Sequence, residues 1–543
     1  MPARKTSKKI APPHRGGGSK ASKRGLSSSR TSSGKRAVKK GEAKKVSLTK
    51  ARAKPITSKK AAKKAGPPTT TPNVMVVNMI PRSLSWEINQ DAEPSIAVNP
   101  ANLLQIVGTA FTPNPAGGDT APIFISTDGG KTWTLNAIVP SGVNPLFGSA
   151  TGDITVAFGG ISNKLYAGIL QDTSDPNVLP MDFLSTDNFA SQTLMKKLLT
   201  RDGPDQPYVH ATTMTGGQNA GKDALFVGSN SGDGGQTSTL DFSLNASATN
   251  PTFKTIILEQ RSTGNANQDG PQVRPASHPS GVVYAAYTGW RATTGNFRAN
   301  TLIVTADIVV VRDDNWGNSP TPFTALVDPS DNLPGIRVVR DIKFPFHSSG
   351  NNIPGQNRLG GDISIAIDPS DNQTIYLAYA EGEDADHYTL HLRVSKNGGQ
   401  LWSPDLLTVP RATNPALSVN SDGKLGFLYQ QLTGSGSALR WETHIQIISP
   451  GGGAAVDLIL SRARADFPVR DGDPYLGDYV HLQAVGKDFY GIFSGNNTPD
   501  NNNFPNGVIY QRNADFKAHK LLDVSGTKEV AVSIDPFFFK ITG

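Results

Sequence analysis

The chain has 543 residues, of which 37% are hydrophobic, with 55 glycines, 39 prolines and no cysteine. The lack of cysteine excludes structural disulfides, thiolate metal sites and a cysteine nucleophile. No run of about 18 apolar residues is present, so the sequence predicts no membrane-spanning helix.

The net charge of +8 combines two unlike parts of the chain. Residues 1–66 contain 22 Lys and Arg and a single acid, Glu42, a net charge of +21, which leaves −13 on the remainder. This segment has too few large apolar residues to offset the entropy of ordering, so we expect residues 1–72 to be a disordered tail. Its charge predicts that residues 1–70 bind a polyanion by counterion release or serve as an address for a loading or export machine. A solubilising leader that binds nothing is the alternative.

The basic N-terminus is not followed by an apolar segment, so no secretory signal peptide is expected. The sequence is compatible with two locations: the cytoplasm, or the outside of the cell after export by a route that does not read such a signal.

From residue 90 onward one pattern recurs along the chain. It opens with an acid or amide and a Pro or Gly, runs through a short alternating strand and a turn, and reaches a strand of the type aliphatic-Tyr-x-Ala-aromatic. Seven units begin at Glu93, Gly152, Asp205, Asp269, Gly361, Ala412 and Gly477. A period of roughly 50 to 70 residues is typical of propeller blades, each a small antiparallel sheet. We therefore predict an all-β, seven-bladed β-propeller over residues 73–543, with six blades as the alternative.

The two ends of the predicted propeller are both strand-like. Residues 73–80 read NVMVVNMI and residues 529–534 read EVAVSI. We expect one or both to join the terminal blade and close the ring, which would give a monomeric propeller.

Two short motifs lie at the same place in their units. Residues 126–133 fit S-x-D-x-G-x-T-W, residues 395–402 fit with Asn for Asp and Leu for Thr, and residues 185–188 hold a degenerate copy. In such a hairpin we expect Asp or Asn to cap the turn, Gly to adopt a positive φ and Trp to pack on the blade. The residues given these structural roles are Ser126, Asp128, Gly130, Trp133, Ser395, Asn397, Gly399 and Trp402.

These motifs resemble the Asp-box, or BNR repeat, of the sialidase (neuraminidase) superfamily, and the resemblance covers about residues 90–515. It implies a propeller whose boxes are structural and lie away from the active site. Sialidases of this superfamily bind the substrate carboxylate with three arginines and use a Tyr backed by a Glu as nucleophile and an Asp as general acid and base. This chain departs from that pattern, because Ile80-Pro81-Arg82 stands where an Arg-Ile-Pro motif is expected.

Acids recur at the start of the first strand of the units, which is the innermost strand of a blade. They are therefore expected to ring one mouth of the central channel: Glu93, Asp153, Asp205, Asp269, Asp362 and Asp478. Clustered carboxylates raise one another's pKa, which suits acid–base chemistry, or they hold a hard cation through oxygen. The structural alternative is that they cap strand ends. No cofactor is otherwise expected.

Candidate roles follow from these positions. Asp362 and Asp478 are the candidate catalytic acids, and Tyr479 is a nucleophile candidate. Arg274 and Arg358 are the candidate substrate anchors, with Glu93, Asp153, Asp205 and Asp269 as further substrate-binding residues. Arg201 and Arg470 also stand near unit openings.

Two functions fit these features. The first is a sialidase-like exo-glycosidase that acts on a glycan or glycoconjugate at the channel mouth. The alternative is a non-catalytic propeller that binds glycan or protein and is delivered or anchored by its basic tail. The fold alone does not decide between them.

Overall fold

A computed structural model describes residues 72–111, 120–142, 152–171, 180–231, 238–261, 273–296, 299, 301–346, 362–382, 384, 387–450, 455–468 and 476–543. All of these described residues belong to one compact unit, residues 69–543. The expected disordered tail lies outside the described residues, and every element below belongs to the unit 69–543.

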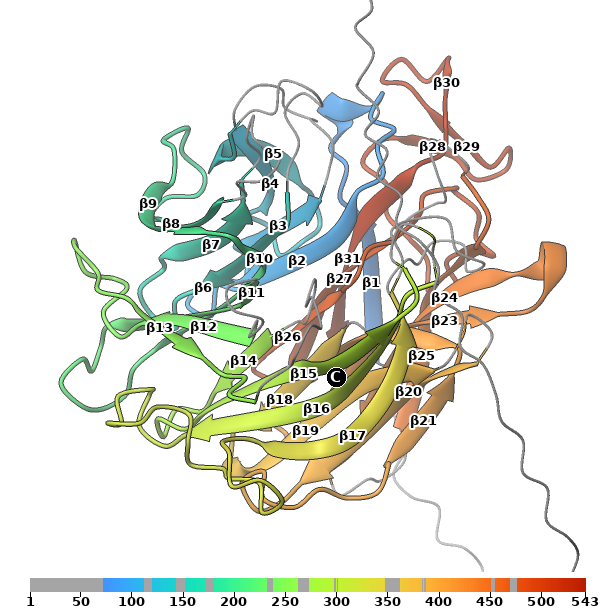
Figure 1. Cartoon of the computed structure of the whole chain (residues 1–543). Coiled ribbons are helices and arrows are strands. Elements are labelled where there is room, and N and C mark those ends of the chain that lie inside the picture. Colours follow the sequence, from blue (N-terminus) through green and yellow to red (C-terminus); the bar gives the residue numbers. More distant parts are fainter. Residues whose placement is uncertain are drawn as a thin grey trace, which may run out of the picture. The chain divides into compact units, whose positions relative to one another are not determined.

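The described residues form an all-β structure of seven four-stranded antiparallel sheets and one three-stranded sheet (Figure 1). Their helical elements are two 3-10 turns, Arg82–Leu84 and Gly436–Ala438. No helix among the described residues has the length and hydropathy needed to span a bilayer.

The first three four-stranded sheets follow one another along the chain. Sheet 1 consists of β2 (Ala92–Val98), β3 (Ile106–Phe111), β4 (Thr120–Ser126) and β5 (Thr134–Pro140). Sheet 2 consists of β6 (Ile154–Phe158), β7 (Leu165–Leu170), β8 (Pro180–Thr186) and β9 (Lys196–Asp202). Sheet 3 consists of β10 (Pro204–Thr213), β11 (Asp223–Ser231), β12 (Ser238–Ser243) and β13 (Lys254–Ile257).

The next three sheets have the same sequential order. Sheet 4 consists of β14 (Val273–Ser277), β15 (Val283–Thr294), β16 (Ile303–Asp313) and β17 (Ile336–Pro345). Sheet 5 consists of β18 (Ile363–Asp368), β19 (Asp371–Gly382), β20 (Tyr388–Ser395) and β21 (Leu407–Pro410). Sheet 6 consists of β22 (Ala412–Val419), β23 (Leu425–Thr433), β24 (Arg440–Ile448) and β25 (Ala455–Arg464).

Sheet 7 is composite, because it takes strands from both ends of the described chain. Its order is β26 (His481–Val485), β27 (Asp488–Asn496), β31 (Ile534–Thr542) and β1 (Asn73–Asn78). The expectation that residues 73–80 join the last sheet is confirmed for β1. The C-terminal partner is β31, whereas Glu529–Val530 is β30 of the small sheet, which also contains β28 (Asn513–Asp515) and β29 (Lys520–Leu522).

The sheets follow one another around a ring. The first strand of each sheet contacts the first strand of the next, and β26 of sheet 7 contacts β2 of sheet 1. Seven apolar layers separate neighbouring sheets; in the layer between sheets 1 and 2, Ala97 and Val107 pack with Ile154 and Val156. Each sheet therefore buries both faces against its neighbours, as the units of a repeat architecture must.

This arrangement explains the strand sequences. Second strands have a sheet on each face and read as near-continuous apolar runs, such as the fully buried Val283–Trp290 of β15. Fourth strands form the outer edge, and β13 carries exposed or half-buried residues throughout.

Side chains of the innermost strands also join neighbouring sheets. The Ile96 and Val98 N–H groups donate to His481 Nδ1 (3.2 Å) and Gln483 Oε1 (2.9 Å). At other junctions a backbone N–H donates to a hydroxyl oxygen of the neighbouring sheet: Val156 to Ser95, Val209 to Thr155, Leu417 to Ser364 and Ala484 to Ser418. Along the pair β2 and β26, Ile96 bonds His481 and Val98 bonds Gln483, so both strands run in the same direction. Neighbouring first strands are therefore parallel, and all of them begin at the same end of the ring.

Candidate functional site at one mouth of the channel

The innermost strands surround a cavity of about 300 Å3, to which all seven sheets contribute lining residues. Since these strands are parallel, the polar residues at their starts gather at one end of the channel, here called the mouth. The structure places five of the residues predicted from the sequence there, together with Tyr479: Glu93, Asp153, Arg274, Asp362 and Asp478.

Three innermost strands begin with the same backbone irregularity. Glu93, Gln206 and Asn414 each precede a proline and adopt the left-handed conformation, with φ of 53°, 54° and 54°. The strand register shifts at each of these positions. The conformation costs about 1–3 kcal/mol for a residue other than glycine, and strain of this kind collects at functional sites. All three side chains are buried.

Arg274 of β14 is the one arginine that the described contacts place in the mouth cluster. Its Nη2 donates to Asp362 Oδ1 at 3.0 Å. Its Cζ lies 4.1 Å from the centroid of the Tyr208 ring and 5.5 Å from that of Tyr479. The described contacts of the guanidinium thus include two cation–π contacts and an ion pair with a carboxylate.

Asp362 immediately precedes β18 and is 3% exposed. Burial raises its pKa to about 7 although the Arg274 guanidinium and the Ile363 N–H both favour the carboxylate, and Asp478 adds to the rise. Oδ1 accepts both of those hydrogen bonds, and Oδ2 has no hydrogen-bond partner among the described residues. A carboxyl group with this pKa is partly protonated at neutral pH and can donate a proton.

Tyr479 lies among the acids of the mouth. Burial raises its pKa well above the usual range, and the nearby Asp153, Glu93 and Asp478 raise it further, whereas Arg274 lowers it. Its hydroxyl has no hydrogen-bond partner in the described part of the chain. These surroundings disfavour a phenolate, so the hydroxyl is suited to donate a hydrogen bond.

The cluster spans neighbouring sheets through Glu93, whose Oε1 accepts the Asp478 N–H at 3.3 Å. Glu93 belongs to sheet 1 and Asp478 stands before sheet 7, so this bond crosses the junction where the ring closes. Asp153 stands before β6 of sheet 2 and is buried as well.

The remaining residues predicted from the sequence either lie outside the mouth cluster or are not described by the structure. Asp205 precedes Gln206, whose N–H it accepts, and its own N–H donates to Asn230 Oδ1, so Gln206 rather than Asp205 matches Glu93. Arg201 lies on the outer strand β9 and pairs with Asp241. Asp269, Arg358 and Arg470 lie outside the described residues.

Sequence reasoning missed four residues of the channel, namely Tyr208, Gln206, Asn414 and His481. A polar residue directly before proline at the start of a unit was the available signal for Gln206 and Asn414. Deeper in the channel, burial lowers the pKa of His481 to about 3, with smaller contributions from Arg274 and His210, and burial lowers that of His210 to about 4. Both histidines are therefore neutral at physiological pH.

Clustered carboxylates that could hold a cation occur among residues other than the acids of the mouth. Among the described residues, three carboxylates offer ligand oxygens within 4.8 Å of one another at one place, Glu87, Asp91 and Asp535. This group is not the predicted acid set. Asp535 already accepts hydrogen bonds from four groups, on Asn78, Asn497, Arg512 and Ser533, which fills the acceptor sites of a carboxylate.

The predicted hairpin turns lie between the third and fourth strands of sheets 1 and 5. In the first, Ser126 Oγ donates to Asp128 Oδ1 (2.8 Å), which also accepts the Thr132 N–H (3.0 Å). Trp133 Nε1 donates to the Gly130 carbonyl (3.0 Å), and Gly130 has a φ of 88°. Ser395, Asn397, Gly399 and Trp402 make the equivalent bonds in the second turn.

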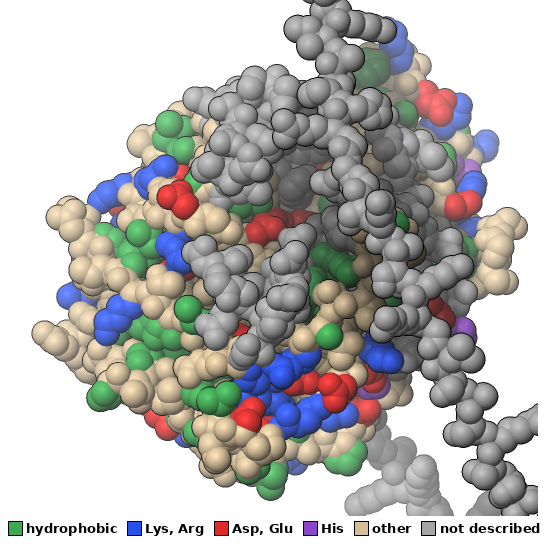
Figure 2. All heavy atoms as spheres, in the orientation of Figure 1, with side chains coloured by type: hydrophobic (Ala, Val, Ile, Leu, Met, Phe, Trp, Pro, Cys, Tyr) green, Lys and Arg blue, Asp and Glu red, His purple; other side chains and the backbone are tan. Residues whose placement is uncertain are grey.

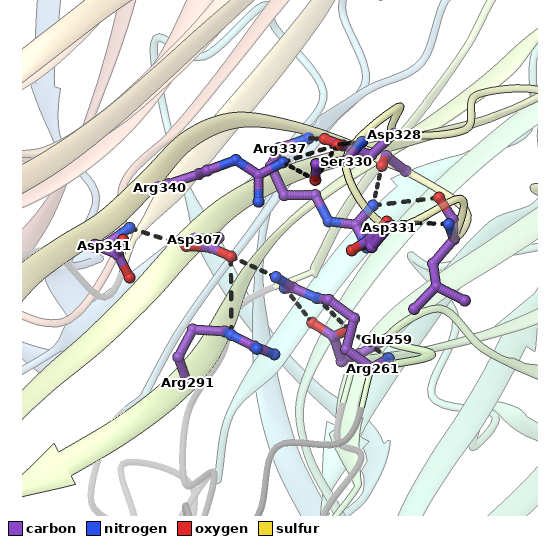
Figure 3. Close-up of polar contacts among 12 residues, drawn as sticks. Glu259, Arg261, Arg291, Asp307, Asp328, Ser330, Asp331, Arg337, Arg340 and Asp341 are labelled. Atoms are coloured by element: carbon purple, nitrogen blue, oxygen red, sulfur yellow. Dashed lines mark hydrogen bonds and ion pairs between the residues drawn. The ribbon is translucent and has the colours of Figure 1, made fainter.

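A second charged cluster lies over β15–β17, where Figure 2 shows basic and acidic side chains side by side. Figure 3 shows its contacts. Arg261 donates to both oxygens of Glu259 (2.8 and 2.6 Å) and pairs with Asp307, and Arg340 donates to Asp328 (2.7 Å). Since its carboxylates are matched by guanidinium groups, this cluster is a structural ion network rather than a reactive site.

Comparisons with known proteins place carbohydrate-active enzymes among the similar structures. No protein-family model matches the chain, and no match is found among curated proteins. An ulvan lyase of a new polysaccharide lyase family is similar at a TM-score of 0.45 and 8% identity, covering 75% of this chain and 92% of that one.

Two further structures extend this comparison. The α-L-arabinanase of Penicillium chrysogenum complexed with arabinobiose is similar at a TM-score of 0.37 and 12% identity, covering 86% of this chain and 98% of that one. A protein of unknown function from Dyadobacter fermentans has a TM-score of 0.39 and 9% identity, covering 87% and 98%. At these values the likeness carries no inference about substrate or reaction.

Proposed function

We propose that the protein is a glycoside hydrolase whose active site is the mouth cluster. The observation that carries the proposal is Asp362, a buried carboxyl group with a pKa of about 7 in a cluster that also contains Glu93, Asp153 and Asp478. Glycoside hydrolysis needs one carboxyl group that is protonated and one that is ionised, on either side of the scissile bond.

The roles follow from the surroundings of each group. Asp362 donates its proton to the glycosidic oxygen, Asp478 takes a proton from the attacking water, and the water oxygen bonds to the anomeric carbon as its bond to the leaving oxygen breaks. Arg274 holds Asp362 in position rather than anchoring substrate, because its charge is engaged by that carboxylate and two aromatic rings. Tyr479 donates a hydrogen bond, since its high pKa disfavours a role as nucleophile.

The charge of the cluster favours an uncharged sugar over sialic acid. Among the described residues, the mouth cluster contains four acids and one arginine, and that arginine pairs with Asp362, whereas a sialic acid carboxylate is best bound by guanidinium groups that are free to pair with it. The proposed active site therefore lies at the channel mouth, as expected from the resemblance to sialidases, but its proposed substrate is a neutral sugar.

The test is turnover of matched aryl glycosides of neutral hexoses and pentoses and of sialic acid. We expect activity on a neutral sugar, and we expect Asp362→Asn and Asp478→Asn to lower kcat by about 10²–10⁴. Asp202→Asn, on an exposed residue of β9, is the control. Turnover of the sialoside alone would contradict the substrate assignment, and full activity of Asp362→Asn would contradict the acid assignment.

A non-catalytic glycan-binding propeller is the second candidate. It is favoured by the burial of every charged member of the mouth cluster, because a buried carboxyl group reaches a scissile bond less readily than an exposed one. Binding to a glycan array without turnover of any glycoside would support it.

We further propose that the fold is a seven-bladed propeller of the Asp-box kind. Seven four-stranded sheets support the blade number, and the Ser–Asp–Gly–Trp bonding of residues 126–133, repeated in residues 395–402, supports the Asp-box assignment. A crystal structure that adds or removes one of these sheets would overturn the blade number.

A further inference from the structure

We propose that a groove between sheets 6 and 7 binds a second sugar unit of the glycan whose reacting unit lies at the mouth; this inference rests on the proposed function. The groove has a volume of about 270 Å3 and is lined by Arg440, Arg464, Phe467, Asn496, Thr498, Asp500 and Asn503. That volume is just below the ~300–1,000 Å3 of small-molecule pockets, so it suits one sugar ring of a longer chain.

The groove opens at the same end of the ring as the mouth. Arg440 begins β24 and pairs in register with Arg464, the last residue of β25. Because the strands alternate in direction, these two residues lie at the end where β22 begins. Asn496 ends β27, which places it beside the start of β26. The groove and the acid cluster are therefore on one face.

The inner end of the groove leads to the segment that carries Asp478. A small adjoining cavity shares Arg464, Phe467 and Asn496 with the groove and is also lined by Gln430 and Leu476. In addition, Asn414 Nδ2 donates to Gln430 Oε1 (3.0 Å) and to the Gly477 carbonyl (2.9 Å). Gln430 in turn donates to the Ser494 carbonyl (3.0 Å). A chain of hydrogen bonds thus links the small cavity beside the groove to the backbone of the residue before Asp478.

The lining has the chemistry of a sugar site. Phe467 is 37% exposed, and one face of its ring is covered by Arg464, whose Cζ lies 5.5 Å from the ring centroid. Arg464 is held in place by two bonds of 3.0 Å to Asp466. The exposed part of the ring can pack against the apolar face of a pyranose, and the amides and hydroxyl around it can bond sugar hydroxyls.

The charges also fit an uncharged sugar. Arg440 and Arg464 in or beside the groove are balanced by Asp466 and Asp500. Arg440 Nη1 donates to the carbonyls of Ser437 (3.1 Å) and Leu439 (2.9 Å), which fixes the guanidinium against the turn before β24. A groove without net charge agrees with the neutral substrate proposed for the mouth.

The experiment compares kcat/KM for xylo-, manno- and gluco-oligosaccharides with kcat/KM for the matching 4-nitrophenyl monoglycosides. Loss of a stacking contact is worth about tenfold, so Phe467→Ala should lower the oligosaccharide-to-monoglycoside ratio about tenfold. Asn503→Ala should lower the ratio in the same direction and covers the case in which Phe467→Ala fails to fold. The matched control is Asn501→Ala, an exposed amide of the same loop that does not line the groove.

The outcomes separate the groove from the proposed function. An unchanged ratio in both variants overturns the groove while hydrolysis at the mouth stands. If nothing is turned over, calorimetric titration of the same oligosaccharides into the full chain decides; weaker binding in Phe467→Ala supports the groove in a binding protein. Neither turnover nor binding of any probe would contradict the proposed function and the groove with it.

Discussion

Asp362 is the residue at which burial and charge act most strongly against each other. The Arg274 guanidinium at 3.0 Å and the Ile363 N–H at 2.7 Å favour its ionised form, and burial still raises its pKa to about 7. The ionised carboxylate therefore costs folding stability, which is a usual feature of catalytic acids.

This balance predicts a pH-dependent stability. Below about pH 4 the carboxyl group is protonated in both the folded and the unfolded protein, and it has no effect. Between about pH 4 and pH 7 the unfolded state loses its proton first, so the free energy of unfolding falls by at most ~1.4 kcal/mol per pH unit from this group. Asp362→Asn removes the ionisation, so its Tm relative to the parent should be higher at pH 8 than at pH 5.

The measurement is thermal unfolding at both pH values, with Asp202→Asn as the control. The control should show no such difference, because Asp202 is exposed. A variant that loses stability equally at both pH values would show that the bond to Arg274, rather than the ionisation, dominates.

The residues at the mouth were only partly predictable from the sequence. Glu93, Asp153, Asp362 and Asp478 stood out because an acid recurs at the start of six of the seven predicted units. The cation–π contact of Arg274 with Tyr208 was not predictable, because it joins different sheets and depends on the curvature of the ring. Gln206 was overlooked in favour of its acidic neighbour Asp205.

At the scale of elements, the two hairpin turns differ mainly in the burial of their tryptophans. Trp133 is 1% exposed and packs on Phe538 with a centroid distance of 5.3 Å, whereas Trp402 is only partly buried. We expect Trp133→Ala to lower the free energy of unfolding by about 3–5 kcal/mol and Trp402→Ala by less.

Urea unfolding of the two variants tests this ranking. Equal losses would show that the shared bond from Nε1 to the glycine carbonyl matters more than packing. A loss of glycan binding without a loss of stability would instead assign the turns to function.

The ion network of Figure 3 joins sheets 3 and 4 and makes a second prediction at this scale. Arg261→Met leaves the buried carboxylates of Glu259 and Asp307 without their shared guanidinium, which should cost about 3–5 kcal/mol. Arg340→Gln should cost less than about 1 kcal/mol, because that side chain is 44% exposed.

Chemical denaturation of both variants provides the comparison, and adding Glu259→Gln to Arg261→Met should recover part of the loss. If the network contributes little to stability, Arg261→Met and Arg340→Gln will both change the free energy of unfolding by similar, small amounts.

The elements themselves were largely predictable, and the exceptions have physical causes. The starts of all seven innermost strands lie within four residues of the predicted unit starts, because a Pro or Gly marks each of them. In sheet 3, Ser243 and Asn245 form a turn of the same kind in which Asn245 accepts the Thr252 N–H at 2.9 Å. Its spacing differs from that of residues 126–133, so the motif could not reveal it.

At the scale of the whole molecule, the charge of the chain is divided between the tail and the rest. We propose that residues 1–70 bind polyanions, since residues 1–66 carry +21 and the remainder −13. Each neutralised phosphate contributes a slope of about −0.9 in log affinity against log salt for duplex DNA. The full chain should therefore bind heparin or DNA at low salt and release it at moderate salt.

A truncated chain that starts at Asn73 provides the comparison on the same heparin column. It should pass through without retention, because its net charge is negative. Equal retention of both chains would move the polyanion contact to the sheets and leave an address function as the better account of the tail.

The composite seventh sheet has a consequence for the order of events during synthesis. Sheets 1–6 each use four consecutive strands, so the hydrogen bonds within each of these sheets need only residues that are made one after another. β1 is made first, but its partner β31 is made last, and Asn73 pairs with Thr542 across nearly the whole sequence. The ring therefore stays open, with β1 and β27 lacking their common neighbour, until translation of the folded part is complete.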